Sequence, residues 1–211
     1  MSTMLQDDRS LPSVESPPSP TDRIFFAVMP GEAATARAQQ LAQTLRQKYD
    51  LHGSLIDTAH LHVTLLFVGN YVGYPNDTIE AARLAAARVV HAPCRVQFNQ
   101  ALTFRNKSGV SHRYPTVLCG DEGVIGMEAL HQNLADSLNR FGFARRPSTM
   151  TPHMTLLYDN KKIITQAVPP IEFDVDEFVL LNRHIGQHRE YSVLGRWSLR
   201  DKWKTRGHNL Q

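Results

Sequence analysis

Apolar residues along this chain fall into two kinds of pattern. Short runs rich in β-branched, leucine and aromatic residues are typical of buried strands, whereas apolar residues three and four positions apart indicate amphipathic helices. The two patterns are interleaved, which predicts an α+β fold. We expect strands at 24–29, 61–68, 94–104, 114–119, 152–158, 171–182 and 190–199, and helices at 32–49, 78–90 and 124–141.

The order of these elements repeats within the chain. Residues 24–68 contain a strand, a helix and a strand, and residues 114–158 contain the same three elements with similar spacing. A repeated supersecondary unit is the usual sequence sign of internal duplication. We therefore expect two structurally related halves.

The two ends of the chain lack this patterning. Residues 1–22 contain several prolines among serines and acidic residues and have no periodic apolar face that could offset the entropy of ordering. We expect a disordered tail over 1–22, a single folded domain over 23–200 and a frayed tail over 201–211.

Composition narrows the class of protein. The 211 residues carry a formal charge of only +3, which argues against a dedicated duplex-DNA binder. No apolar run reaches the ~18 residues of a membrane span, and the first residues have no secretory h-region. The two cysteines, Cys94 and Cys119, show no metal-ligand spacing. We expect reduced thiols and a cytoplasmic protein that does not contact membranes.

One five-residue pattern, His-x-Thr-Leu-Leu, occurs twice. It begins at His62 in the strand expected at 61–68 and at His153 in the strand expected at 152–158. Composition alone predicts only about 0.07 copies of its first four positions in this chain. Two copies are therefore many more than the composition predicts by chance.

Strand alternation places the polar residues of each motif on one face. His62 shares a face with Thr64, and His153 shares a face with Thr155. If the two halves face each other, two imidazoles and two hydroxyls meet, which suits in-line displacement at phosphorus with one acid and one base. The alternative is structural: each histidine is satisfied by a backbone carbonyl on a half-buried strand.

The motifs and their surroundings resemble a known family, the two-histidine phosphoesterases. Within it the chain is most similar to the LigT-like RNA 2',3'-cyclic phosphodiesterases, historically called 2'-5' RNA ligases. The resemblance implies a bilobal fold in which two pseudo-symmetric antiparallel sheet-and-helix lobes surround a central cleft. It spans 23–199 and rests on the segments RIFFAV (23–28), LHVTLLFVG (61–69), PHMTL (152–156) and YSVLGRWSL (191–199).

The resemblance also implies an activity and residue roles. RNA 2',3'-cyclic phosphate ends would be hydrolysed to 2'-phosphates without metal or other cofactor, with reversible 2'-5' ligation as a side activity. His62 would be the proton donor to the departing 3'-oxygen and His153 the proton acceptor from water, while Thr64 and Thr155 would bind the phosphate. The symmetry of the motifs leaves acid and base unassigned without the resemblance. We expect a monomer acting on RNA with a cyclic phosphate end or on 2'-5'-linked oligonucleotides.

The chain departs from the family at one position. Members often carry arginine five residues after the second histidine, where this chain has Tyr158. By strict alternation Tyr158 points away from the face of His153, so we do not expect it to stack on a base. Lys161, Lys162 or Arg105 could replace the missing charge, although each is better explained as a solvated surface residue.

Other candidate sites are weaker. His60 and His62 form a His-x-His pair without an evident third metal ligand. Asp174, Asp176 and Glu177 fit an exposed strand face better than an acid pair. A further group of basic residues, expected in a polar hairpin, could contact RNA: His184, His188 and Arg189.

Two other functions remain open from the sequence. The same site could act on 2'-5' oligoadenylates, other 2'-5' linkages or ADP-ribose cyclic phosphates. Alternatively, the fold could be retained in a non-catalytic RNA-binding module. Intact histidine and threonine in both motifs favour an enzyme.

Overall fold

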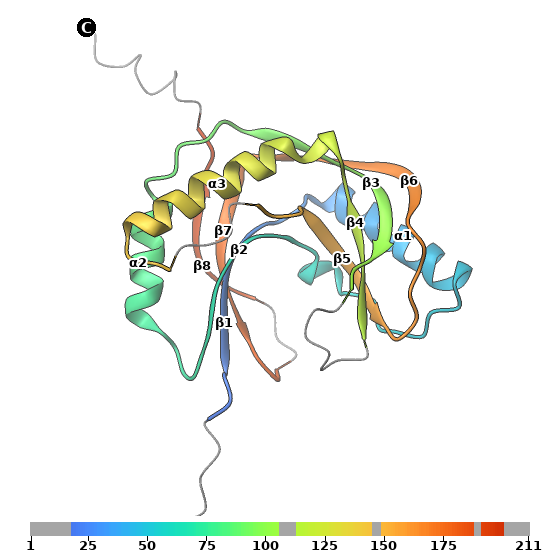
Figure 1. Ribbon diagram of the computed structural model, residues 1–211, viewed down its shortest axis with the longest axis horizontal. Helices are drawn as coiled ribbons and strands as arrows, with labels where there is room; N and C mark the ends of the chain where they lie inside the picture. The colour runs from blue at the N-terminus through green and yellow to red at the C-terminus, as the bar shows by residue number, and fades with distance from the viewer. Residues whose placement is uncertain (1–17, 106–112, 145–148, 188–190, 201–211) are drawn as a thin grey trace, which may run out of the picture.

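The computed structural model describes residues 18–105, 113–144, 149–187 and 191–200. These residues form one antiparallel sheet of eight strands in the order β6-β3-β4-β5-β2-β1-β7-β8, together with helices (Figure 1). The strands are β1 (Asp22–Val28), β2 (Val63–Tyr71), β3 (Cys94–Thr103), β4 (Tyr114–Cys119), β5 (His153–Asp159), β6 (Gln166–Val175), β7 (Glu177–His184) and β8 (Ser192–Ser198), and the α-helices are α1 (Glu32–Lys48), α2 (Asn76–Ala86) and α3 (Ile125–Arg140).

The sheet consists of two similar halves. In one half β1 pairs with β2 and α1 connects them, and in the other β4 pairs with β5 and α3 connects them. The halves meet where β2 lies beside β5, through a single ladder pair between Val63 and Met154. The expected α+β fold with two related halves is confirmed.

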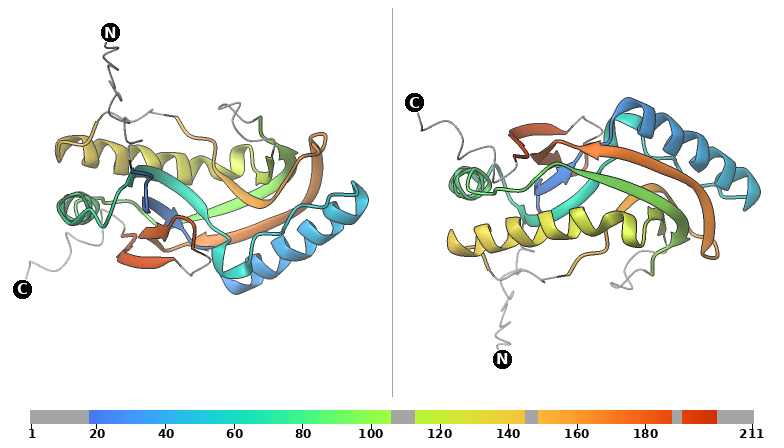
Figure 2. Two further views of the ribbon diagram at one scale, coloured as in Figure 1. Left: turned by 90° about the horizontal axis from the view of Figure 1, so that it is seen from below. Right: turned by 90° about the horizontal axis from the view of Figure 1, so that it is seen from above.

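All three α-helices bury their apolar sides in the main core. α1 contributes small side chains such as Ala38, which let its backbone approach the strands, and α3 contributes leucines such as Leu134. Figure 1 shows α3 passing across the molecule, with α2 towards β8 and α1 towards β6. Figure 2 shows the strands running between α1 and α3. One continuous core results, because helix and strand residues pack together in it.

The other face of β1 and β7 carries a second, smaller cluster. Phe25 and Ala27 alternate with the core residues of β1, and Val179 and Leu181 do so on β7. The buried helix residues belong to the main core and none of them joins this cluster. We call the side of the sheet with Phe25 and Ala27 the helix-free face.

One expected strand is two strands. The segment 171–182 divides at Asp176 into the end of β6 and the start of β7, which lie in different halves of the sheet. The buried positions reveal the break, because Val175 and Phe178 are both in the core although their spacing is odd. Pro169 and Pro170 lie inside β6, where they are tolerated because β6 is an edge strand.

The ends of the described chain differ slightly from expectation. β1 begins at Asp22, which is buried, two residues before the strand expected at 24–29. Asp22 accepts hydrogen bonds from Asn182 and Thr21. Residues 1–17 and 201–211, which include most of the two expected tails, lie outside the described residues.

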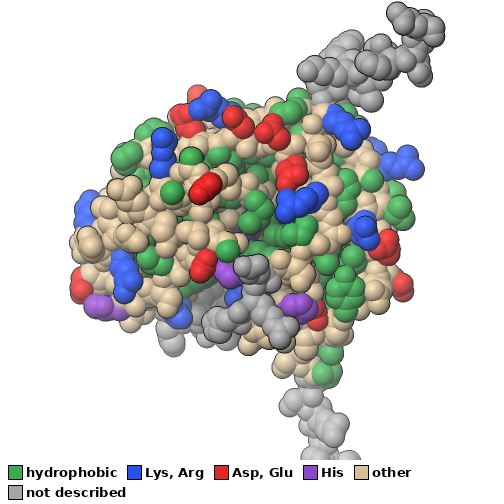
Figure 3. Space-filling view, turned by 180° about the vertical axis from the view of Figure 1, so that it is seen from behind, with side chains coloured by type: hydrophobic (Ala, Val, Ile, Leu, Met, Phe, Trp, Pro, Cys, Tyr) green, Lys and Arg blue, Asp and Glu red, His purple; other side chains and the backbone are tan. Residues whose placement is uncertain are grey.

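Two further observations concern the helices and the charged side chains. No helix within the described ranges has the length and apolar character needed to cross a membrane. Figure 3 shows basic and acidic side chains interspersed on one side of the molecule, in keeping with the net charge of only +3.

Candidate functional site

The junction of β2 and β5 brings the two repeated motifs together. Val63 pairs with Met154, and both side chains are fully buried in the core. Antiparallel register therefore places His62 across from Thr155, and Thr64 across from His153, on the helix-free face. Residues opposite one another on neighbouring strands lie about 4.5–5.5 Å apart at Cα. The four polar residues of the motifs thus form one patch in which each histidine neighbours the other motif's threonine.

Both imidazoles are oriented in the same way. Nδ1 of His62 donates to the carbonyl of His60 at 2.7 Å, and Nδ1 of His153 donates to the carbonyl of Thr151 at 2.7 Å. A carbonyl can only accept, so Nδ1 carries the proton when each ring is neutral. Each ring thus has the hydrogen bond to a backbone carbonyl that the structural alternative requires, but this bond uses Nδ1 only. Nε2 of each ring remains the atom that can take up or release a proton.

His62 lies in an aromatic enclosure. Its ring centroid is 5.2 Å from that of Phe25 and 5.4 Å from that of Tyr191. Burial lowers the pKa of His62, the hydrogen bond to the His60 carbonyl opposes this effect, and the positive charges of His153 and Arg183 lower the pKa further.

His153 has a different environment. Its ring packs edge-on against Phe104 with centroids 4.9 Å apart. Phe104 follows the end of β3, and its N–H donates to the carbonyl of Pro115. The same motif therefore sits in two unequal surroundings.

Each motif is followed by a β-bulge. On β2, Ala27 pairs with Thr64 but Phe26 pairs with Leu66, so Leu65 is an extra residue. A bulge of this kind shifts the alternation of side chains by one position. Phe67, which pairs with Phe25, consequently returns to the helix-free face with 44% of its surface exposed.

The bulge on β5 is equivalent and overturns one expectation. Val117 pairs with Thr155 but Thr116 pairs with Leu157, so Leu156 is extra. Tyr158 therefore lies on the face of Thr155, 42% exposed, although strict alternation predicted the opposite face. The paired leucines in both motifs, all buried, were the sequence signal for a broken alternation.

Both bulges are held by donors outside the ladder. Nδ1 of His131 on α3 donates to the carbonyl of Leu65 at 2.8 Å, and the N–H of Ile56 donates to the carbonyl of Leu156 at 2.8 Å. An unpaired buried carbonyl is costly, so these contacts stabilise the shifted register. The sequence interpretation did not single out His131, which holds the first bulge, or Phe67, which is exposed on the face of the motifs.

The cations considered as replacements for the family arginine have other contacts. Nζ of Lys161 lies 2.7 Å from a carboxylate oxygen of Asp50, and Nζ of Lys162 lies 4.2 Å from the ring centroid of Tyr114. Arg105 is exposed after the end of β3. The interpretation of these residues as surface charges agrees with the contacts of the two lysines.

The remaining candidates lie apart from the motif patch. Glu177 binds Arg196, while Asp174 and Asp176 are exposed. His184 contacts the buried Asp22, 3.1 Å from its Oδ1. His188 and Arg189 lie outside the described residues.

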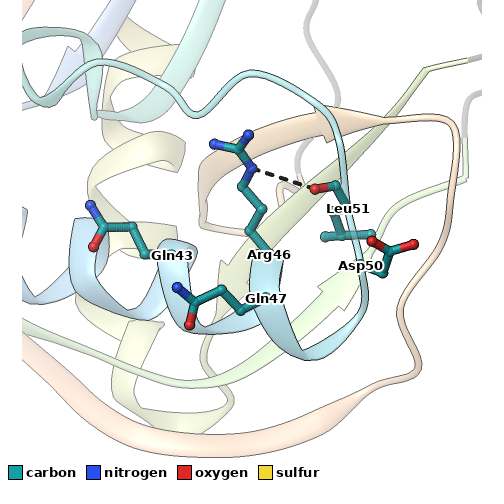
Figure 4. A pocket seen from close by; sticks show the side chains of 5 residues that line it. All are labelled: Gln43, Arg46, Gln47, Asp50 and Leu51. Carbon is teal, nitrogen blue, oxygen red and sulfur yellow. Dashed lines mark hydrogen bonds between the residues drawn. The ribbon is translucent and has the colours of Figure 1, made fainter.

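Two hollows of the surface lie away from the motifs. One shallow hollow lies between α2 and β8. Another lies at the end of α1, where Arg46 Nε donates to the Leu51 carbonyl at 3.4 Å (Figure 4). Its lining has no pair of groups suited to acid–base chemistry. Within the described ranges, no three His, Cys, Asp or Glu residues are grouped as a metal would require.

Known structures share this fold. E. coli LigT in its apo form is 24% identical, with a TM-score of 0.65, and the match covers 87% of this chain and 100% of LigT. A protein of Thermus thermophilus, TT0787, is 22% identical, with a TM-score of 0.64 and coverage of 85% and 99%. No curated protein matches the chain.

The family itself is identified by sequence. A family model described as the 2'-5' RNA ligase superfamily matches residues 29–187, which include both motifs and the junction of β2 with β5. That match spans well over half of the chain. The chain therefore belongs to the 2'-5' RNA ligase superfamily.

Proposed function

We propose that this protein hydrolyses RNA 2',3'-cyclic phosphate ends to 2'-phosphates, using His62 as proton donor and His153 as proton acceptor. The observation that carries the proposal is the register at Val63 and Met154, because it interleaves two imidazoles with two hydroxyls on one face. An acid, a base and two neutral donors are the groups that a displacement at phosphorus requires. The proposed reaction uses no metal or other cofactor.

The proposed chemistry is a single in-line displacement. Water attacks phosphorus while Nε2 of His153 takes its proton, and the bond from phosphorus to the 3'-oxygen breaks as Nε2 of His62 donates a proton to that oxygen. The products are a 2'-phosphate and a 3'-hydroxyl. Hydroxyls of Thr64 and Thr155 donate hydrogen bonds to the non-bridging oxygens as negative charge develops there. Solvent exchange then restores both imidazoles.

The lowered pKa of His62 bears on its role as donor. Burial and neighbouring positive charge disfavour the imidazolium in the free protein. A cyclic phosphate diester is an anion, and an anion beside His62 favours the charged ring. We propose that the substrate itself raises the pKa of His62, so that the donor is protonated mainly when the phosphate is bound.

The exposed rings beside the patch provide a place for the nucleoside. Phe67 and Tyr158 follow the two bulges and lie on the face of the motifs. Aromatic rings bind bases of single-stranded nucleic acid by stacking, without strong sequence preference. E. coli LigT has been crystallised with 3'-AMP and with phosphate, so a relative of the same fold accepts a nucleotide. We propose that one or both rings contact the terminal nucleoside.

The proposal also covers the cellular location and the oligomeric state of the enzyme. Cys94 and Cys119 are free thiols, and burial raises the pKa of Cys119 to about 12. Unpaired buried thiols are typical of proteins in reducing compartments. We propose RNA processing in the cytoplasm by a monomer, since all four motif residues come from one chain.

Product analysis tests the proposed activity. A short RNA ending in a 2',3'-cyclic phosphate is incubated with the protein and excess chelator, and the product isomers are separated. We expect a 2'-phosphate, formed by wild type and by a His91→Ala control on the surface, but not by the doubly substituted His62→Ala/His153→Ala protein. Formation of a 3'-phosphate, or a requirement for metal, would contradict the proposal. Cleavage of 2'-5'-linked RNA alone would support the related activity on such linkages.

A further inference from the structure

Two arginines face each other on the same side of the sheet as the motifs. Arg23 on β1 is the direct ladder partner of Arg183 on β7. Arg23 lies two residues before Phe25 on β1, and Arg183 lies two residues after Leu181 on β7. Strand alternation therefore places both on the helix-free face. The fold thus places the two arginines opposite each other on neighbouring strands, although they are 160 residues apart in the sequence.

The charges of this pair are not balanced by carboxylates. Like charges directly opposite on neighbouring strands destabilise a sheet. Among the described residues, no carboxylate lies within ion-pair distance of Arg23 or Arg183, whereas Arg83, Arg95 and Arg196 each have an acidic partner. An anion bound between the two side chains would offset their repulsion.

One hydrogen bond and one electrostatic effect describe how the two arginines are placed. Nε of Arg23 donates to Oδ1 of Asn70 at 3.0 Å, which fixes that side chain over the face while leaving its terminal nitrogens for other acceptors. Burial is the main cause of the lowered pKa of His62 and of the raised pKa of Tyr191; the positive charge of Arg183 adds to the first effect and opposes the second, so its field reaches the proposed site.

Along β1 the arginine pair and the motif patch occupy separate positions. Thr64 pairs with Ala27, and Arg23 lies four residues from Ala27 along β1, a distance of about 13 Å at Cα. Phe67 lies between these two positions, because it pairs with Phe25. A nucleic-acid strand along this line would meet the motif patch, then an aromatic ring, then the arginine pair.

We propose that Arg23 and Arg183 form a second phosphate subsite, which binds a phosphodiester of the RNA on the 5' side of the reacting end. This inference rests on the proposed function and extends it from a terminal group to a substrate class, the oligonucleotide. Arginine suits this task because its planar fork can bind phosphate oxygens in pairs. The protein accordingly prefers oligonucleotide ends over a nucleoside cyclic phosphate.

The kinetic test compares two substrates that differ in this phosphate. One is a nucleoside 2',3'-cyclic phosphate, and the other is a trinucleotide with the same cyclic end. The readout is the ratio of the kcat/KM values for the trinucleotide and the mononucleotide, because any effect of Arg183 on His62 changes both values equally. Charged hydrogen bonds of ~1.5–3 kcal/mol correspond to a fall in this ratio of about 10- to 100-fold for Arg23→Gln/Arg183→Gln.

The matched control is Arg88→Gln, an exposed arginine after α2. It should keep the wild-type ratio, and each single arginine variant should keep part of it. An unchanged ratio in the double arginine variant, with melting temperature preserved, would overturn the second subsite. A wild-type ratio near one would overturn it as well.

A binding measurement separates this inference from the proposed function. A 5'-fluorescent trinucleotide ending in a 2'-phosphate is titrated with each protein at two salt concentrations. The double arginine variant should bind about 10- to 100-fold more weakly than wild type, with a shallower salt dependence. This result would support the subsite even if the protein lacked cyclic phosphodiesterase activity. Equal affinity of wild type and variant would overturn the subsite even if the activity were present.

Discussion

The two halves of the sheet have the same backbone plan but surround their histidines differently. Each has a His-x-Thr motif, a bulge one residue later and an exposed aromatic residue after the bulge. His62 is enclosed by Phe25 and Tyr191 and lies in the field of Arg183, whereas His153 packs against Phe104. Different environments allow identical groups to take the separate roles of acid and base. The repeated motif provides two histidines, and their unequal packing gives the two imidazoles different environments.

Among substitutions outside the two histidines, the largest effect we expect comes from the hydroxyls. Thr64→Val and Thr155→Val keep the β-branched shape and should leave the fold intact. Each should lower kcat on a cyclic-phosphate RNA by about 10- to 1,000-fold, the scale of a lost donor to a developing oxyanion. Steady-state rates alongside melting curves provide the measurement. A full rate in either variant would remove that threonine from the proposed chemistry.

The aromatic residues after the bulges should give the next largest effect. Base stacking contributes about 1–3 kcal/mol per base, so Phe67→Ala or Tyr158→Ala should weaken nucleotide binding by a corresponding amount. Titration with a labelled 2'-phosphate trinucleotide measures this loss, and the exposed Tyr74 provides a matched control as Tyr74→Ala. If neither ring affects affinity, the nucleoside does not lie over this part of the face.

The next effect is on stability and concerns the hydrogen bond that holds the first bulge. His131→Leu keeps a similar volume but removes the donor to the Leu65 carbonyl. Leaving a buried acceptor unpaired should lower the free energy of unfolding by about 1–3 kcal/mol. Denaturant titration measures it. The corresponding contact in the other half comes from the backbone N–H of Ile56, so no side-chain substitution there should have the same consequence. Unchanged stability of His131→Leu would show that the bulge does not depend on this bond.

The smallest expected change is a shift in titration. In the free protein His62 should titrate below the ordinary value of 6.5, because burial and nearby positive charge disfavour its imidazolium. Arg183→Gln removes one of these charges, so the pKa of His62 should rise. For a donor that must be protonated, the alkaline limb of kcat/KM should move to higher pH in the same variant. NMR titration of the imidazole resonances checks the direction. An unchanged or lower pKa would contradict the assigned cause.

The sequence predicted the features that depend on local pattern. Alternation along a strand correctly paired His62 with Thr64 and His153 with Thr155, and the repeated order of elements correctly indicated two halves. Family membership agrees with the resemblance of the motifs.

The features that the sequence did not predict depend on register between strands. The bulges shift alternation after each motif, which is why Tyr158 was assigned to the wrong face. The pairing of Arg23 with Arg183 exists only because β1 lies beside β7, and no local pattern specifies that neighbourhood. The break at Asp176 carries no glycine or proline, so the strand pattern continued across it.

The most direct test of the central claim is a double-mutant cycle on the two histidines. Single-turnover rates on a cyclic-phosphate RNA are measured for wild type, His62→Ala, His153→Ala and the double variant, with folding checked for each. If the imidazoles act together as acid and base, each single substitution should cost about 10²- to 10⁴-fold. The double variant should then be little slower than either single one, since residues that act as a unit are strongly non-additive. Near-wild-type rates in either single variant, or fully multiplicative losses in the double variant, would contradict the account.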